Sequence, residues 1–111
     1  MNKEENNNFP EIVIIKRLLP IGTVVKIKDD KNKKFMIVSN IMNYDDNGKP
    51  VAYEYMACLY PFGYVDEKSF WFFNEENITD IYQLGYLDDK EYLKKIITQS
   101  VASGKRVHIE G

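Results

Sequence analysis

The sequence predicts an α+β fold, with about five antiparallel strands forming a twisted meander or partly open barrel and one C-terminal helix packed on it. Three observations support this prediction. Apolar and polar residues alternate over much of residues 23–84, as in strands that bury one face. Polar or glycine-containing turns separate these runs, which favours antiparallel neighbours. After residue 88 the apolar residues adopt helical spacing instead.

The predicted strands are short runs rich in β-branched and aromatic residues. They cover residues 23–28, 34–43, 51–60, 69–73 and 77–84. Between the first three, residues 29–33 and 45–50 have the composition of turns. In the fourth strand, either Phe70 and Phe72 or Trp71 and Phe73 face the core, because neighbouring side chains point to opposite faces. Alternation alone does not choose between the two pairs.

The helix is predicted from apolar residues three and four positions apart. They are Leu93, Ile96, Ile97 and Val101, with the small Ser100 on the same face. Asp88 and Glu91 have the spacing of a capping box at the N-terminus. Gly104 is a suitable stop at the C-terminus.

One domain is expected over residues 11–103, since about 100–150 residues is the usual size of a domain. Residues 1–10 are rich in Asn and Glu and are expected to form a flexible polar tail. Residues 104–111 form either a C-terminal extension or a short edge strand. Residues 12–19 fit a strand by their β-branched content and a short helix by their spacing, so both remain open.

Composition predicts a cytoplasmic protein that spans no membrane. No apolar run approaches the roughly 20 residues of a membrane helix, and the N-terminus lacks the basic and apolar regions of a signal peptide. Thirteen of the fifteen aromatic residues fall between residues 44 and 92. Residues 35–111 hold seven basic and twelve acidic residues, a charge of −5. We therefore expect no nucleic-acid binding, which needs a basic groove beside the aromatic rings.

Residues 43–54 nearly match a calcium-binding loop of the EF-hand type, with oxygen-bearing residues at alternate positions, Gly48 at the turn and Glu54 at the twelfth position. Three features argue against calcium. Asn43 replaces the usual first Asp, Pro50 lies within the loop, and the flanking segments are predicted strands rather than helices. A hairpin turn followed by a surface glutamate is the simpler interpretation, and we expect no metal or other cofactor.

No residues suggest catalysis, so the protein is expected not to be an enzyme. The acidic doublets lie on adjacent positions, which point to opposite faces of an extended chain and do not form a converging pair. Cys58 has His108 as its one conceivable histidine partner. It lies among apolar residues in a predicted strand, where a small buried thiol is ordinary.

Several stretches resemble a bacterial family of small proteins of unknown function. They are Leu19–Val25, Phe35–Val38, Tyr53–Tyr64, Phe72–Ile78 and Leu84–Tyr86. Members of this family are encoded beside LXG toxins of the type VII secretion system. The resemblance implies an accessory protein or chaperone that binds such a toxin, or its helical segment, before export. The position of Phe62 is often acidic in that family, so this turn departs from the pattern.

The aromatic surplus and the resemblance together predict a protein-binding module. Tyrosine and tryptophan are enriched at interfaces because one edge of the ring can remain hydrated. The expected partner-binding residues are Tyr60, Phe62, Tyr64, Trp71, Tyr82 and Tyr86. Alternatives are an immunity protein that blocks the toxin's C-terminal domain and a carbohydrate-binding or hydrolytic domain. The sequence does not indicate the oligomeric state, the identity of the partner or which rings are exposed.

Overall fold

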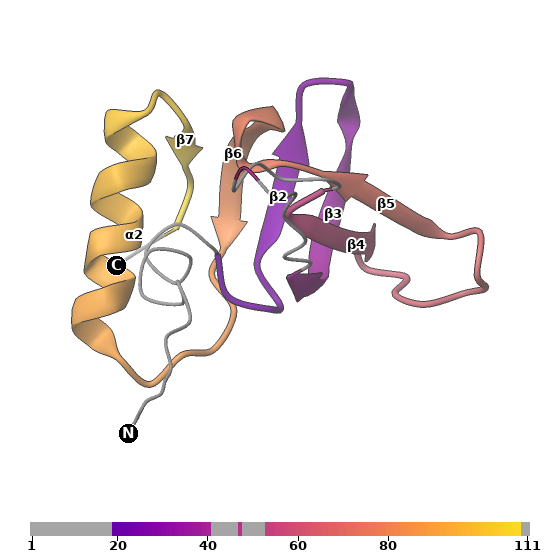
Figure 1. The fold of residues 1–111 in the computed structure, drawn as a ribbon, viewed down its shortest axis with the longest axis horizontal. Helices are drawn as coiled ribbons and strands as arrows, with labels where there is room; N and C mark the ends of the chain where they lie inside the picture. The colour runs from indigo at the N-terminus through magenta and orange to yellow at the C-terminus, as the bar shows by residue number, and fades with distance from the viewer. Residues whose placement is uncertain (1–18, 41–46, 48–52, 110–111) are drawn as a thin grey trace.

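The structure, a computed structural model, describes residues 19–40, 47 and 53–109 (Figure 1). Within these residues it has a mixed sheet of six strands and one C-terminal helix, which confirms the α+β class. The elements are β2 (Val24–Ile27), β3 (Asp30–Asn40), β4 (Tyr55–Leu59), β5 (Phe70–Phe73), the 3-10 helix η1 (Glu75–Asn77), β6 (Ile78–Gln83), α2 (Lys90–Ala102) and β7 (Arg106–Val107). The alternative assignments of residues 12–18 lie outside the described residues.

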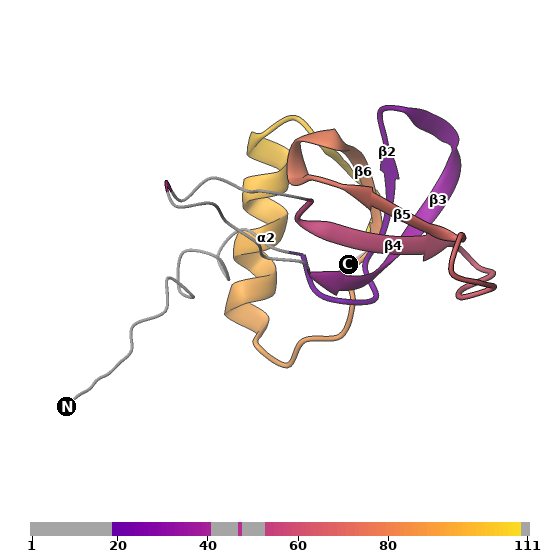
Figure 2. The same cartoon turned by 45° about the vertical axis from the view of Figure 1, so that its right-hand side comes forward.

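The strand order β5-β4-β3-β2-β6-β7 is a meander only in part. The first four of these strands follow one another antiparallel, but β6 then pairs with β2 instead of lying beside β5. Helix η1 makes this crossing, and the backbone N–H of Lys28 donates to the carbonyl of Asn77 at 2.9 Å. Figures 1 and 2 show β4 and β5 turned steeply against β2 and β3, so the sheet curls without closing into a barrel.

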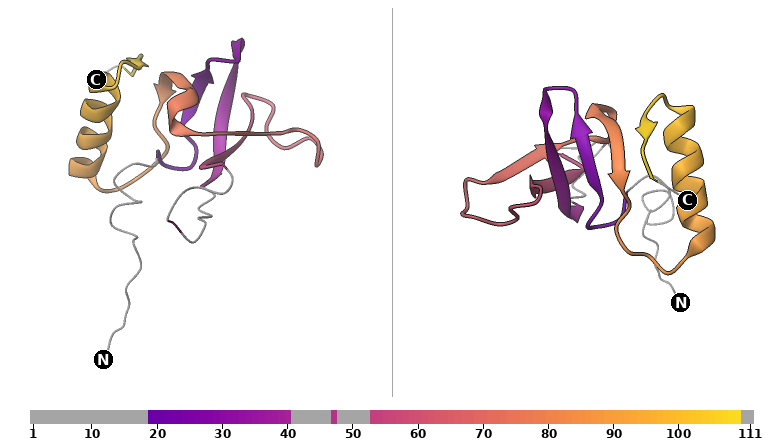
Figure 3. Two further views of the ribbon diagram at one scale, coloured as in Figure 1. Left: turned by 45° about the horizontal axis from the view of Figure 1, so that its top comes forward. Right: turned by 180° about the vertical axis from the view of Figure 1, so that it is seen from behind.

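Strand β7 gives the C-terminal extension a place in the sheet. It pairs in parallel with β6, matching Arg106 to Asp80 and Val107 to Ile81. The backbone N–H of His108 continues this ladder to the carbonyl of Ile81 at 2.8 Å. A parallel neighbour requires a crossover, which α2 provides; Figures 1 and 3 show α2 standing beside β7.

Two local predictions were displaced by a few residues. The polar turn predicted at 29–33 is confined to Lys28 and Asp29, and β3 begins at Asp30. Because β3 starts earlier than predicted, more of its residues lie opposite the end of β2 than a regular pairing would allow. The register shift between Val25 and Ile27 accommodates them. The cap of α2 is Asp89 rather than Asp88, since the Asp89 carboxylate accepts the backbone N–H of Tyr92 at 3.0 Å.

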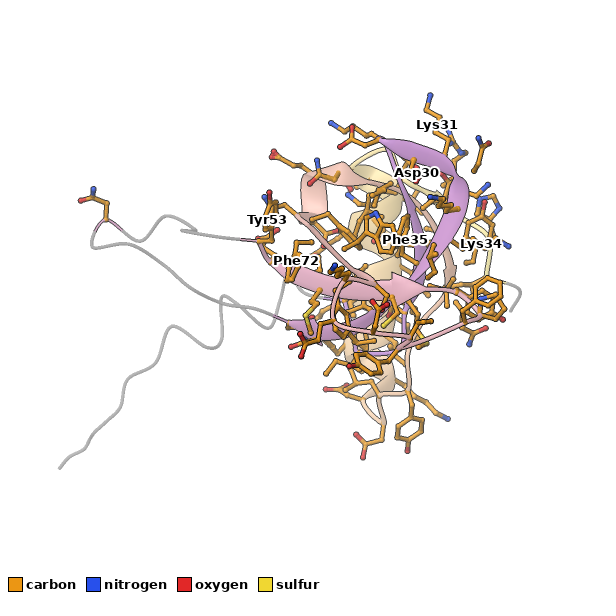
Figure 4. The ribbon with its side chains drawn as sticks, turned by 90° about the vertical axis from the view of Figure 1, so that its right-hand side faces the viewer. Asp30, Lys31, Lys34, Phe35, Tyr53 and Phe72 are labelled. Carbon is orange, nitrogen blue, oxygen red and sulfur yellow. The ribbon has the colours of Figure 1, made fainter. Side chains whose placement is uncertain are left out.

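The core lies on the face of the curled sheet that we call the inner face. Val25, Phe35, Tyr55, Ala57 and Phe73 are almost fully buried there, and Ile96 of α2 belongs to the same cluster. Figure 4 shows Phe35 inside the curl. Of the two alternating pairs in β5, Trp71 and Phe73 therefore face the core.

A buried tyrosine joins distant parts of the chain within this core. The Tyr55 hydroxyl accepts the backbone N–H of Leu19 at 2.8 Å and donates to the Glu75 carboxylate. The other Glu75 oxygen lies 3.4 Å from the Lys105 ammonium, whose side chain is largely buried. Burial, together with the negative charge of Glu75, raises the pKa of Tyr55. The hydroxyl therefore keeps its proton and can serve as the donor to Glu75.

Gly85 marks the closest backbone approach among the glycines described. An alanine Cβ there would lie 1.9 Å from the Ile21 carbonyl oxygen and 2.7 Å from its carbon. The Gly85 N–H also donates to the buried hydroxyl of Thr23 at 3.0 Å. The segment after β6 can therefore pack against the start of β2 only without a side chain at this position.

We predict that Gly85→Ala lowers the free energy of unfolding by about 3 kcal/mol, because the backbone of Ile21 must move to admit the methyl group. Urea denaturation followed by circular dichroism measures this change. The control is Gly63→Ala, where the methyl group meets open space and only the positive φ of 76° opposes it, at about 1–2 kcal/mol. Equal destabilisation of the two variants would contradict the close approach.

Candidate protein-binding surface

The loop between β4 and β5 (residues 60–69, the β4–β5 loop) carries a group of exposed apolar side chains. Tyr60 is 46% exposed, Phe62 74%, Tyr64 64% and Val65 66%. Figures 1 and 3 show the loop projecting from the sheet at the end away from α2. Three of the predicted partner-binding residues therefore lie together on one protruding segment.

Local hydrogen bonds fix the backbone of this loop. The N–H of Gly63 donates to the carbonyl of Leu59 at 2.9 Å, and its φ of 76° suits glycine. Further along, the Ser69 hydroxyl donates to the carbonyl of Asp66 at 2.6 Å and accepts the N–H of Asp66 at 3.2 Å. Because polar groups form the turn, its apolar side chains are not needed to hold it.

The loop continues into the outer face of the sheet, opposite the core. Tyr64 packs on Phe70 of β5, with ring centroids 5.4 Å apart. Phe72 lies two residues further along the same face of β5 and contacts Tyr53, with ring centroids 5.9 Å apart (Figure 4). Tyr53 and Phe72 are both about half exposed. We call Tyr53, Tyr60, Phe62, Tyr64, Val65, Phe70 and Phe72 together the apolar surface.

The structure does not bring the other three predicted residues into this surface. Trp71 points to the inner face, where its ring lies 5.2 Å from that of Phe35. Tyr86 is 88% exposed, but it lies in the connection from β6 to α2, which runs on the α2 side of the sheet, away from the β4–β5 loop (Figure 1). Tyr82 belongs to a separate polar cluster on the outer face.

Sequence reasoning missed four members of the apolar surface, namely Tyr53, Val65, Phe70 and Phe72. Alternation in β5 left open whether the pair Phe70 and Phe72 or the pair Trp71 and Phe73 faces the core. The burial of Phe73 shows that Phe72 lies on the opposite face. Val65 directly precedes the polar residues Asp66–Ser69, which gave some indication of its exposure. Tyr53 lies within the strand predicted over residues 51–60 but precedes β4, so strand alternation does not determine its surroundings.

The polar cluster centres on the buried carboxylate of Asp80 in β6. Arg106 donates to both of its oxygens at 2.9 Å, and the Nε2 of His108 lies 2.8 Å from one of them. The His108 ring stacks on Tyr82 at 4.3 Å. Burial alone would raise the pKa of Asp80, but hydrogen bonds from Arg106, Thr79 and His108 and the charge of Arg106 hold it well below its usual range.

The thiol of Cys58 and the calcium-like segment show no catalytic or metal-binding arrangement in the described residues. Cys58 is buried, burial raises the pKa of its thiol, and His108 contacts Asp80 instead. Of residues 43–54, only Asn47, Tyr53 and Glu54 are described, and the Glu54 carboxylate accepts the backbone N–H of Glu75 at 2.8 Å. In the part of the chain that the structure describes, no three His, Cys, Asp or Glu side chains gather as in a metal site.

Among the described residues, no helix combines the length and apolarity needed to cross a membrane.

We predict that Asp80→Asn lowers the free energy of unfolding at pH 7 by about 2 kcal/mol, because charge-assisted hydrogen bonds to Arg106 and His108 are lost. A carboxyl whose pKa is depressed by folding contributes stability above its unfolded pKa of about 3.9 and loses it as the pH falls toward the folded value. The difference between wild type and variant should therefore shrink below about pH 4. Urea titrations from pH 3 to 7 measure it.

The matched control is Asp29→Asn, which removes an exposed carboxylate from the β2–β3 turn. It should change the stability by less than about 0.5 kcal/mol. A wild-type advantage over Asp80→Asn that stays constant down to pH 3 would contradict the depressed pKa.

Comparison with known proteins identifies a family without a known activity. The family model described as a domain of unknown function (DUF4176) matches residues 18–93. This range includes the whole β4–β5 loop and ends within the first turn of α2. No curated protein and no solved structure matches the chain. Because the matched range covers well over half of the 111 residues, the chain belongs to the DUF4176 family.

Proposed function

We propose that this protein is a non-enzymatic binding module that acts in the cytoplasm as an accessory protein or chaperone of an LXG-type toxin before type VII secretion. The apolar surface is its contact with the toxin. The link to LXG toxins comes from the resemblance of the sequence motifs, and membership of the DUF4176 family is compatible with it. The binding role itself is supported by the exposed side chains of one loop.

The observation that carries this proposal is the grouping of four exposed apolar side chains within residues 60–65. A single exposed apolar residue is ordinary, whereas large contiguous groups of exposed apolar side chains often mark interaction sites. Burying such area against a partner stabilises a complex by roughly 25 cal/mol per Å² before the costs of association. The rings on this loop therefore supply a driving force that a protein partner can use.

The fixed backbone of the loop favours binding further. Ordering a mobile loop at an interface costs free energy, and a loop that is already held avoids much of this cost. Here Gly63 and Ser69 close hydrogen-bonded turns on either side of Tyr64 and Val65. The apolar side chains are thus presented before the partner arrives.

We predict that Phe62→Ser weakens binding of the toxin about tenfold or more, because a central apolar contact is replaced by a hydroxyl. The control is Val101→Ser, which removes a side chain that is similarly exposed but lies on α2; it should change the affinity less than twofold. Isothermal titration calorimetry with the purified toxin measures both. Equal affinities of the two variants would exclude the loop as the contact.

Co-expression with an LXG-type toxin from the same organism tests the function itself. The expected result is that the two proteins co-purify, and that toxin solubility and export fall when the gene is deleted. The proposal fails if they do not co-purify and export is unchanged. Binding of the isolated C-terminal toxic domain, with protection of growing cells, would indicate an immunity protein instead.

A further inference from the structure

Two lysines on the outer face share one tyrosine ring and have no described carboxylate partner. The ammonium of Lys34 in β3 lies 4.2 Å from the centroid of the Tyr82 ring, and that of Lys26 in β2 lies 5.6 Å from it. No carboxylate of the described residues forms an ion pair with either. By contrast, Lys33 pairs with Asp30 at 3.2 Å and Lys105 with Glu75 at 3.4 Å.

The nearby carboxylate does not neutralise these two lysines. Asp80 lies in register with Lys26, but Arg106 and His108 occupy its oxygens. The ammonium groups of Lys26 and Lys34 therefore share the Tyr82 ring without a carboxylate between them among the described residues. Like charges on neighbouring strands repel each other, and the ring of Tyr82 offsets this only in part. An anionic group placed between the lysines would remove the repulsion.

The lysine pair adjoins the apolar surface. The backbone N–H of Tyr60 donates to the carbonyl of Lys34 at 2.9 Å, one step beyond the pairing of Phe35 with Leu59. Tyr60, the first residue of the loop, therefore lies beside Lys34. A ligand that covers Tyr60 reaches the positive cluster within one strand spacing, about 4.8 Å.

We propose that Lys26 and Lys34 bind carboxylates of an acidic segment of the partner protein, whose apolar side chains cover Tyr60 and the rest of the β4–β5 loop. This inference rests on the proposed function and specifies the chemistry of the partner. Tyr82 is a positioning residue that holds the two ammonium groups on the outer face. Opposite charges of this kind orient a complex and accelerate its formation.

A protein segment fits this surface better than a nucleic acid does. Single-stranded nucleic acids need free aromatic faces on which bases stack. The Tyr82 ring is instead engaged by the His108 ring at 4.3 Å and by Lys34. Beyond Lys34 the face continues with the apolar side chains Met36 and Phe70 and not with further cations that could follow a phosphate backbone.

The test compares two double variants that remove the same charge. Lys26→Gln with Lys34→Gln removes the proposed carboxylate contacts, whereas Lys94→Gln with Lys95→Gln removes two lysines of α2, away from the cluster. The probe is an LXG-type toxin from the same organism, titrated by calorimetry at 50, 150 and 400 mM NaCl. We expect the first variant to bind at least tenfold more weakly at 150 mM, with a flatter dependence on salt. The second should stay within twofold of wild type.

Variants of Tyr82 separate positioning from a general loss of structure. Tyr82→Phe keeps the ring and should retain the affinity, whereas Tyr82→Leu should approach the Lys26/Lys34 double variant. Thermal unfolding of each variant checks that the fold is intact. If Tyr82→Phe and Tyr82→Leu lost the same amount of affinity, the positioning role of the ring would be contradicted.

The outcomes distinguish the proposed carboxylate contact from the proposed binding of the toxin. If wild type does not bind the toxin, both fail. If wild type binds and the Lys26/Lys34 variant binds equally well with the same salt dependence, only the carboxylate contact fails. A 20-nucleotide oligothymidylate serves as the second probe. If it binds wild type and loses affinity with the Lys26/Lys34 variant while toxin binding is unchanged, the cluster is a nucleic-acid site and the inference is overturned.

Discussion

The hydroxyl of Tyr55 is the contact on which the arrangement of this fold most depends. It lies within the core and joins four parts of the chain, since Leu19 donates to it from before β2, Glu75 accepts from it in η1 and Lys105 pairs with that glutamate after α2. A buried lysine and a partly buried glutamate are each costly unless paired. The tyrosine and its partners therefore determine jointly where η1 crosses the sheet and where the chain returns after α2. With η1 in place, β6 lies beside β2, and β7 can add to β6.

The periodicity of the sequence predicted the strands and the helix of this fold well, but it predicted less well which strands lie next to each other in the sheet. Alternation located the strands approximately, and the spacing of Ile96 and Ser100 located the buried side of α2. The pairing of β6 with β2 could not be predicted in this way, because it depends on Asn74 and Asn77, whose side chains close the η1 turn, and on a glutamate bound to Tyr55. Long-range polar contacts of this kind leave no periodic pattern.

The candidate site was predictable to the extent that it consists of consecutive residues. Tyr60, Phe62 and Tyr64 are close in sequence, so the turn that follows β4 brings them together. Trp71 and Tyr82 carry the same chemistry, but the face of the strand decides their surroundings, and that face follows from packing. The Asp80 cluster was missed because Arg106 and His108 lie 26 and 28 residues after Asp80 in the sequence. The parallel pairing of β6 with β7 brings them together.

The turn that Ser69 closes after the exposed loop has a consequence for how such a protein can diverge. Backbone shape there is set by Gly63, Asp66 and Ser69, while Tyr60, Phe62, Tyr64 and Val65 contribute little to the core. Substitutions at these four positions are therefore expected to leave the free energy of unfolding nearly unaltered. The chemistry of this exposed surface can change during evolution without compensating changes in the sheet. Surface chemistry and foldability are thus encoded by separate residues.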